Sequence, residues 1–418
     1  MTEERVRDTS GQPFASEAKS VLDRLRAALG DMIAATNRPI MKAADLHHAL
    51  GIDRRLSWAI YNVATTTDGL RAGPYVPRPM HLKTFFRAAA KHGISAELIA
   101  AAVGAAKDFE DTVARHAGDR AMFDSMVSAI AGDDEAETID RQQRRSVFRG
   151  LRHLWGVQVR TRVTCTFVHR SADPEFADFV TLMGYIGLRQ SRHGAPVVIS
   201  HASFANDDGS PIGWEKREPL DPAAQTEHGI ALLPDFCSQP LPQFRTIEAS
   251  GGQIHGDLVL SDVGDTAAVD YIAGWIDRHA VKTCRTSDNR FAGFCARTRI
   301  PCELLIHDVV VLDGMYASDA PTAVMYPESI DEGPFPARPR SLQRLEFKAA
   351  ATCLGNGAKA LRTPEVPRYG EVAEYVFNRL GWDGERFKVY RCRVAYPMLP
   401  STTAICFTLP ERSEASAS

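Results

Sequence analysis

Seven side chains between residues 54 and 65 have the types and the spacing that nucleic-acid recognition uses. The seven residues are Arg54, Arg55, Ser57, Trp58, Tyr61, Asn62 and Thr65. Most of them recur three or four residues apart, and residues at that spacing share one face of an α-helix. Arg can pair with guanine through two hydrogen bonds, Asn can pair with adenine, and Ser, Thr and Tyr can bind phosphate. We therefore expect a helix whose outward face can bind DNA.

The segment around these residues, 41–66, predicts two short helices joined by a tight turn at Gly51-Ile52-Asp53. Gly51 can adopt the left-handed conformation that such a turn requires, and Asp53 can cap the second helix. The two helices and the preceding one should enclose a set of apolar side chains. That set is Leu46, Leu50, Ile52, Ile60 and Val63.

Residues 41–66 resemble the helix-turn-helix of bacterial transcription regulators, in which the second helix enters the DNA major groove. Two positions depart from that pattern, because His47 stands where a small residue is usual and Ser57 where an apolar one is usual. The resemblance implies that Arg54, Arg55 and Ser57 reach base edges first. It also implies double-stranded DNA as the partner and a homodimer that reads two half-sites. The alternative is a solvated helix face within a three-helix interaction module, with Trp58 packed in its core.

A second basic set lies on the helix that should end near Trp155. Arg141, Arg145, Arg149 and Arg152 share one face of that helix. Such a stripe can follow a phosphate backbone, so these residues are phosphate-contact candidates. A stripe of this kind is also typical of a solvated face, of salt bridges to an acidic neighbouring domain, or of a joint between two halves of a chain.

The charge of the chain is distributed unevenly. Its 418 residues hold 49 Lys and Arg against 52 Asp and Glu, a net charge of only −3. Residues 38–92 alone carry nine cations and three acids, or +6, and residues 141–162 carry seven Arg and no acid. The rest of the chain therefore carries −16. This asymmetry is typical of a nucleic-acid-binding part joined to an acidic part, and excludes only a uniformly basic protein.

The sequence predicts no metal site and no cofactor. Cys284, Cys295 and Cys302, with His279 and His307 near them, match no common zinc spacing, and buried thiols are the simpler interpretation. No nucleophile elbow, zinc-protease motif or dinucleotide fingerprint is present. His307 and Asp308 fall on an apolar, buried strand, so they should point to opposite faces as core polar residues. One of those faces could instead border a ligand pocket.

The hydrophobic periodicity predicts an α+β protein with an all-α domain at residues 16–155 and a mixed domain at 156–410. Residues 1–15 and 411–418 should be disordered tails. In the mixed domain, whose sheet should be largely antiparallel, we expect strands at 157–167, 196–203, 228–233, 254–261 and 302–312. Helices are expected near 176–190, 266–279, 341–354 and 370–380. Residues 386–396 and 402–409 should form an antiparallel pair.

These observations favour a DNA-binding transcription regulator whose C-terminal domain senses a small ligand or drives assembly. A non-catalytic interaction protein is the first alternative. An enzyme is the second, and its site would gather His255, His307 or Asp308. The charged N-terminus has no signal-peptide core, no apolar run is long enough to span a membrane, and the cysteines are scattered. We therefore expect a cytoplasmic protein that does not enter a membrane.

Overall fold

The computed structural model describes residues 14–131, 134–195, 197–203, 218–224, 230–249, 253–285, 290–317, 320–327, 344–345 and 350–411. All but residue 411 of the tail expected at 411–418, and all but two residues of the one expected at 1–15, lie outside these ranges. Residues 14 and 15 are helical instead of disordered. None of the described helices is both long and apolar enough to cross a membrane.

The chain divides into two compact units, Met1–Gln142 (unit 1) and Gln143–Ser418 (unit 2). The α8 helix (Asp134–Trp155) runs across this division. The boundary expected between residues 155 and 156 therefore differs from the observed division, which falls within α8 between residues 142 and 143. The expected position marks only the end of that helix, just before β1 (Val157–Arg170) begins.

Unit 1 is helical throughout its described residues, as expected. Its elements are α1 (Phe14–Ala34), α2 (Ala43–Leu50), α3 (Arg54–Thr65), α4 (Gly69–Ala72), η1 (Gly73–Tyr75), α5 (Pro79–Lys91), α6 (Ala96–His116) and α7 (Arg120–Ala131). One apolar core joins them, with Leu25, Leu29, Phe85 and Phe109 completely buried. Long helices with a single apolar stripe leave their other side to polar residues, and that side faces solvent.

The centre of unit 2 is a seven-stranded sheet in the order β11-β12-β9-β1-β2-β7-β4. Its strands are β1, β2 (Phe176–Gln190), β4 (Glu218–Pro219), β7 (Val269–Lys282), β9 (Cys302–Leu312), β11 (Thr352–Asn356) and β12 (Phe387–Ala395). Only the β1–β9 pair is parallel among these described strands, so the sheet is largely antiparallel, as expected.

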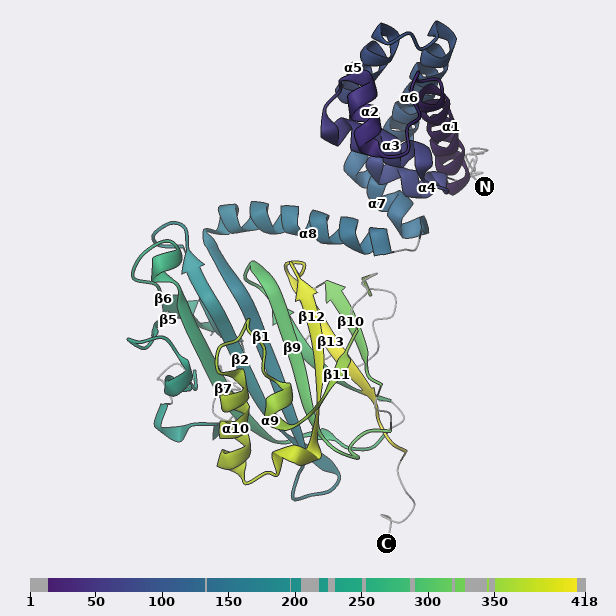
Figure 1. Ribbon diagram of the computed structural model, residues 1–418. Helices are drawn as coiled ribbons and strands as arrows, with labels where there is room; N and C mark the ends of the chain where they lie inside the picture. Colours follow the sequence, from purple (N-terminus) through teal and green to yellow (C-terminus); the bar gives the residue numbers. More distant parts are fainter. Residues whose placement is uncertain are drawn as a thin grey trace, which may run out of the picture. The chain divides into compact units, whose positions relative to one another are not determined.

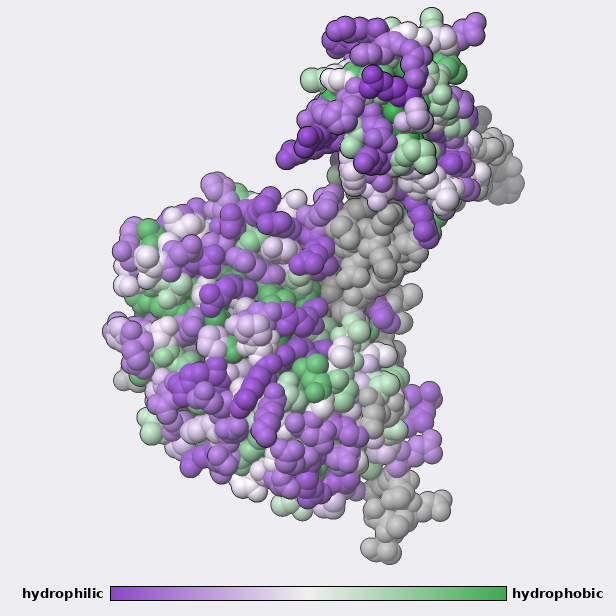
Figure 2. Space-filling model, in the orientation of Figure 1, coloured by the Kyte–Doolittle hydropathy of each residue, from purple (hydrophilic) through white to green (hydrophobic). Residues whose placement is uncertain are grey.

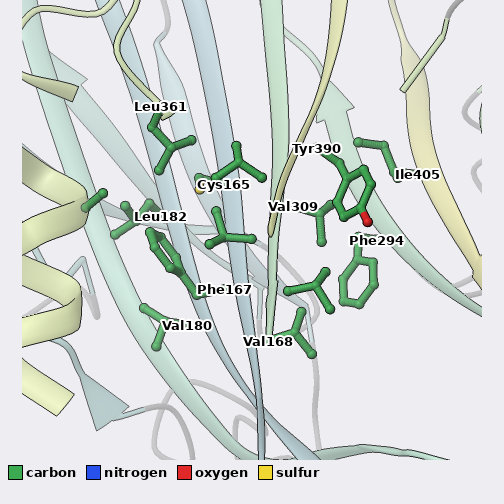
Figure 3. Close-up of a cluster of buried hydrophobic side chains, with 14 of the residues drawn as sticks. Cys165, Phe167, Val168, Val180, Leu182, Phe294, Val309, Leu361, Tyr390 and Ile405 are labelled. Carbon is green, nitrogen blue, oxygen red and sulfur yellow. The ribbon is translucent and has the colours of Figure 1, made fainter. Parts of the chain in front are cut away.

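Each face of this sheet is covered by another layer (Figure 1). The helices α9 (Gly357–Ala360) and α10 (Tyr369–Leu380) lie on one face, where the Phe377 and Phe167 ring centres are 5.4 Å apart. A three-stranded sheet of β10 (Thr322–Pro327), β13 (Ser401–Thr408) and β8 (Phe291–Thr298) covers the other face, through contacts such as Tyr390–Phe407. Figure 3 shows apolar side chains from both sides of the central strands, with Leu361 on the helical side and Ile405 on the other.

A further three-stranded sheet contains β3 (Val198–Ser203), β6 (Gln253–Val259) and β5 (Gln243–Ala249). Short 3-10 turns complete the described elements of this unit: η2 (Pro222–Ala224), η3 (Pro234–Phe236), η4 (Asp265–Ala267) and η6 (Gly384–Arg386). The strands expected at 196–203, 254–261 and 302–312 and the helix at 370–380 are confirmed within one or two residues. Of the strand expected at 228–233, the described part forms only an isolated bridge at Leu232.

Two expected helices and the expected C-terminal strand pair are wrong, and a third expected helix is wrong in its described part. The helices expected at 176–190 and 266–279 are the long strands β2 and β7. Both lie inside the seven-stranded sheet with apolar residues on each face, which removes the alternation that identifies a strand. Part of 341–354 lies outside the described residues, and Thr352–Asn356 is strand. The strands expected to pair at the C-terminus belong to different sheets, since β12 pairs with β9 and β11 whereas β13 pairs with β8 and β10.

Candidate nucleic-acid interface

The turn between α2 and α3 has the local structure expected from its residues. Gly51 is left-handed, with a φ of 63°, and its N–H donates to the carbonyl oxygen of His47. The carboxylate of Asp53 accepts hydrogen bonds from the backbone N–H groups of Arg55 (2.8 Å) and Leu56 (3.3 Å). These bonds lower the pKa of Asp53 and satisfy two N–H groups at the start of α3. The start of α3 is therefore fixed by its own sequence.

Packing holds α3 against its neighbours. All five apolar side chains expected between the helices are buried, namely Leu46, Leu50, Ile52, Ile60 and Val63. His47, where a small residue is usual, donates from Nδ1 to the carbonyl oxygen of Ile52 and so bridges the turn. The carboxylate of Asp45 accepts from the N–H groups of Met41 and Lys42, both at 3.0 Å, which anchors the start of α2.

Ser57 is a correction to the expected interface. Its side chain is completely buried, and its hydroxyl donates to the carbonyl oxygen of Asp53 at 2.9 Å. It therefore occupies an inward position, where the helix-turn-helix pattern has an apolar residue, and it is not on the outward face. The prediction that Ser57 reaches a base edge is wrong.

Three other candidates use their hydrogen-bond donors within unit 1. The hydroxyl of Tyr61 donates to the carbonyl oxygen of Met41 at 2.7 Å, and that of Thr65 donates to the oxygen of Tyr61 at 2.8 Å. The amide of Asn62 donates to the oxygen of Trp58 at 2.7 Å. These side chains stabilise α3 and its connection to α2, so in this conformation they are less available to DNA than expected.

The remaining candidates, Arg54, Arg55 and Trp58, are exposed on the N-terminal half of α3. Trp58 is 54% exposed, so the alternative that packs it in a core is wrong. Its ring meets the ring of Tyr75 edge-on, with the centres 5.4 Å apart. Neither arginine forms a salt bridge with a residue that the structure describes. These three side chains form the available part of the candidate interface.

Most cations of residues 38–92 share this lack of a partner. Eight exposed side chains make no salt bridge within the described ranges: Arg38, Lys42, Arg54, Arg55, Arg78, Lys83, Arg87 and Lys91. The three acids of the same segment are occupied. Asp45 and Asp53 accept backbone N–H groups, and Asp68 pairs with Lys19 at 3.3 Å. The segment therefore keeps a net charge of +6, and none of its three acids forms a salt bridge with these eight cations.

The cations of α1 and α6, in contrast, have acidic partners. Arg24 pairs with Asp108 at 3.2 Å, and Arg115 pairs with Glu17 at 2.5 Å. Lys107 lies 3.8 Å from Asp111. Much of the visible face of unit 1 is hydrophilic (Figure 2), but only the segment 38–92 leaves most of its cations unpaired. In unit 1, the cations of α1 and α6 that pair with acids thus contrast with the unpaired cations of residues 38–92.

A groove of about 590 Å³ lies beside α3. Its lining comes from the end of α1, from the following segment and from α3: Gly30, Ile33, Ala34, Thr36, Asn37, Arg38, Pro39, Ile40, Tyr61, Ala64 and Thr65. Arg38 brings an unpaired cation to this groove. In the sequence, Arg38 was counted only among the cations of residues 38–92. Its position just before residues 41–66 could have indicated that it lies near the candidate interface. The contact of Tyr75 with Trp58 could not be predicted from the sequence, because the two residues are too far apart in the chain for helical spacing to relate them.

The arginine stripe of α8 is exposed at all four positions, Arg141, Arg145, Arg149 and Arg152. Arg141 belongs to unit 1 and the other three belong to unit 2. The guanidinium carbon of Arg145 lies 5.9 Å from the centre of the Tyr396 ring, and Arg152 donates to the side chain of Gln158 at 3.1 Å. At least two of these arginines therefore contact unit 2 itself, and their role as phosphate contacts stays a prediction.

Asp308 and His307 have different surroundings in the core of unit 2. The carboxylate of Asp308 accepts two hydrogen bonds, each 2.8 Å, from the guanidinium of Arg391. The His307 ring is also completely buried, but neither of its nitrogens has a hydrogen-bond partner among the described residues. Burial, with the nearby charge of Arg162, lowers the pKa of His307 to about 3. The expectation of satisfied core polar residues is right for Asp308 and wrong for His307.

All eight cysteines are free thiols. Burial raises the pKa of Cys295, Cys302 and Cys392 to about 12 in each case, which keeps them protonated. Among the described residues, no three His, Cys, Asp or Glu side chains gather as a metal site would require. His255, an alternative catalytic candidate, has no described side chain.

Comparison with known protein families finds no matching family model, and comparison with curated proteins finds no match either.

Proposed function

We propose that this protein is a sequence-specific binder of double-stranded DNA and a regulator of transcription. The observation that carries the proposal is the pair Arg54 and Arg55, which are exposed on α3 and form no salt bridge with a described residue, within a segment whose net charge is +6. Phosphate attraction supplies the affinity of such a surface, and arginine side chains on a helix in the major groove supply specificity for guanine. Unit 2 then senses a small ligand or drives assembly.

The proposed DNA complex contains two copies of the chain. Proteins that present one helix to the major groove commonly read two half-sites, separated by about 34 Å or one turn of DNA. A palindromic selected sequence would agree with this arrangement. The mass of the complex in solution measures the number of chains directly.

Selection from random DNA, followed by binding measurements on arginine variants, tests the proposal. Replacing Arg54 or Arg55 by Ala should weaken binding to the selected sequence by about 1–3 kcal/mol and relax the preference at one position. Arg24→Ala is the matched control, because it removes the same charge from a residue that is already paired with Asp108. Unchanged affinity in both α3 variants would contradict the assignment of these residues to bases.

A second candidate, docking to another protein, is favoured by one observation. Met41, Trp58 and Met80 are 79%, 54% and 74% exposed, which is unusual for large apolar side chains. Apolar docking would respond weakly to salt, whereas DNA binding weakens steeply as the salt concentration rises. Measuring the affinity at a series of salt concentrations therefore separates the two functions.

A further inference from the structure

Trp58 lies at the centre of the outward face of α3. Arg54 and Arg55 precede it by four and three residues, and Tyr61 and Asn62 follow it by three and four. This spacing places all of them on one side of the helix. The other large apolar side chains of α3 (Leu56, Ile60 and Val63) are buried. Trp58 is therefore the large apolar group that α3 presents on its candidate DNA-binding face.

The Trp58 ring is supported on one side by a neighbouring aromatic ring. The Tyr75 ring packs against it at an interplanar angle of 80°, and Tyr75 ends the short η1 turn. A side chain that already packs against a neighbour loses less conformational freedom on binding than a fully mobile one. The Tyr75 contact thus restricts the Trp58 ring on one side and leaves its other side open to a partner.

The neighbouring side chains limit which base feature this part of α3 can recognise. The side chains of Tyr61, Asn62 and Thr65 already donate hydrogen bonds to backbone carbonyl oxygens of unit 1. The uncharged indole of Trp58 lies between these residues and the two arginines along α3. In the major groove, the apolar group that distinguishes one base from the others is the C5 methyl of thymine. Apolar side chains read thymine by packing against that methyl group.

We propose that Trp58 determines specificity by packing its indole against the C5 methyl of a thymine, next to guanines contacted by Arg54 and Arg55. This inference rests on the proposed DNA-binding function and extends it to the composition of the site. The recognised half-site would combine guanine with thymine at adjacent or nearby positions. Tyr75 acts as a positioning residue for the indole.

Replacing single thymines of the selected DNA by deoxyuridine tests this inference on the unmodified protein. Deoxyuridine keeps the pairing and the O4 acceptor of thymine and removes only the methyl group. Loss of one buried methyl should weaken binding of the wild-type chain about fourfold at one thymine position. Trp58→Ala should bind thymine and deoxyuridine equally there, whereas Trp58→Phe should keep part of the difference. Met80→Ala, which removes another exposed apolar side chain, should keep all of it.

The outcomes separate this inference from the function on which it rests. Salt-sensitive binding to a selected sequence that tolerates deoxyuridine at every thymine would overturn the role of Trp58 and leave the DNA-binding proposal in place. A discrimination that persists in Trp58→Ala would overturn it as well. If the wild-type chain selects no sequence, the proposed function fails and the role of Trp58 fails with it.

Discussion

The residues of α3 show how far side-chain chemistry can be interpreted from a sequence. Helical spacing identified the outward positions of Arg54, Arg55 and Trp58, because those positions follow from geometry alone. The same spacing misplaced Ser57, which lies beside them in the sequence but turns inward and bonds to Asp53. Spacing also could not show that Tyr61 donates to Met41, twenty residues away, since that contact depends on how α2 packs on α3.

His307 should make the stability of the protein depend on pH. An unfolded chain has an ordinary histidine pKa near 6.5, whereas the folded pKa is about 3. Between these values the unfolded state binds a proton that the folded state rejects, so the free energy of unfolding falls as the pH falls from 6.5 toward 3. This contribution is fully present above pH 6.5.

Urea unfolding of the wild-type chain and of His307→Leu at pH 7 and pH 5 measures this effect. The wild type should lose about 2 kcal/mol more unfolding free energy than the variant over that interval. Taking the difference between the two proteins cancels the titration of the other groups. Equal losses in both would show that the pKa of His307 is the same in the folded and unfolded states, which would contradict the depressed value.

At the scale of elements, local signals predicted unit 1 well and unit 2 only in part. Gly51 and Asp53 place the turn before α3 because their preferences are local. β2 and β7 were mistaken for helices because both faces of each strand are covered, and burial of that kind depends on distant segments. Two glycines in β2, Gly184 and Gly187, were a signal against a helix. At Gly184 an added Cβ would lie 3.0 Å from the carbonyl oxygen of Tyr271 on the adjacent β7.

The turn before α3 should depend on the backbone freedom of Gly51. No atom lies within 4 Å of the position that a Cβ would occupy there, so a substitution meets only the cost of a left-handed φ of 63°. Gly51→Ala should therefore reduce the free energy of unfolding by about 1–2 kcal/mol. Gly51→Asn should lose less, because Asn tolerates this conformation.

Urea unfolding of the two Gly51 variants checks this expectation, and Gly30→Ala is a suitable control. Gly30 also has open space around the added Cβ, but it lies within α1, where Ala is the better helix former. Equal stability of Gly51→Ala and Gly51→Asn would mean that the turn rearranges without a left-handed residue.

At the scale of the whole molecule, the net charge of −3 conceals how the charges are arranged. The sequence could locate the excess of +6 within residues 38–92, because counting charges needs no structure. It could not show which cations have partners. Arg24 and Arg115 reach acids 84 and 98 residues away in the chain, and that pairing requires the folded arrangement of α1 and α6. The unpaired group around α3 was visible only after these contacts were known.

The dependence of DNA affinity on salt concentration tests the central claim most directly. If the unpaired cations of residues 38–92 contact phosphates, a plot of log K against log salt for the selected DNA should have a slope steeper than about −3. Arg87→Ala should reduce the magnitude of that slope by about 1, whereas Arg24→Ala, which removes a cation already paired with Asp108, should leave it unchanged. A slope near zero, or an equal response to both substitutions, would contradict the account.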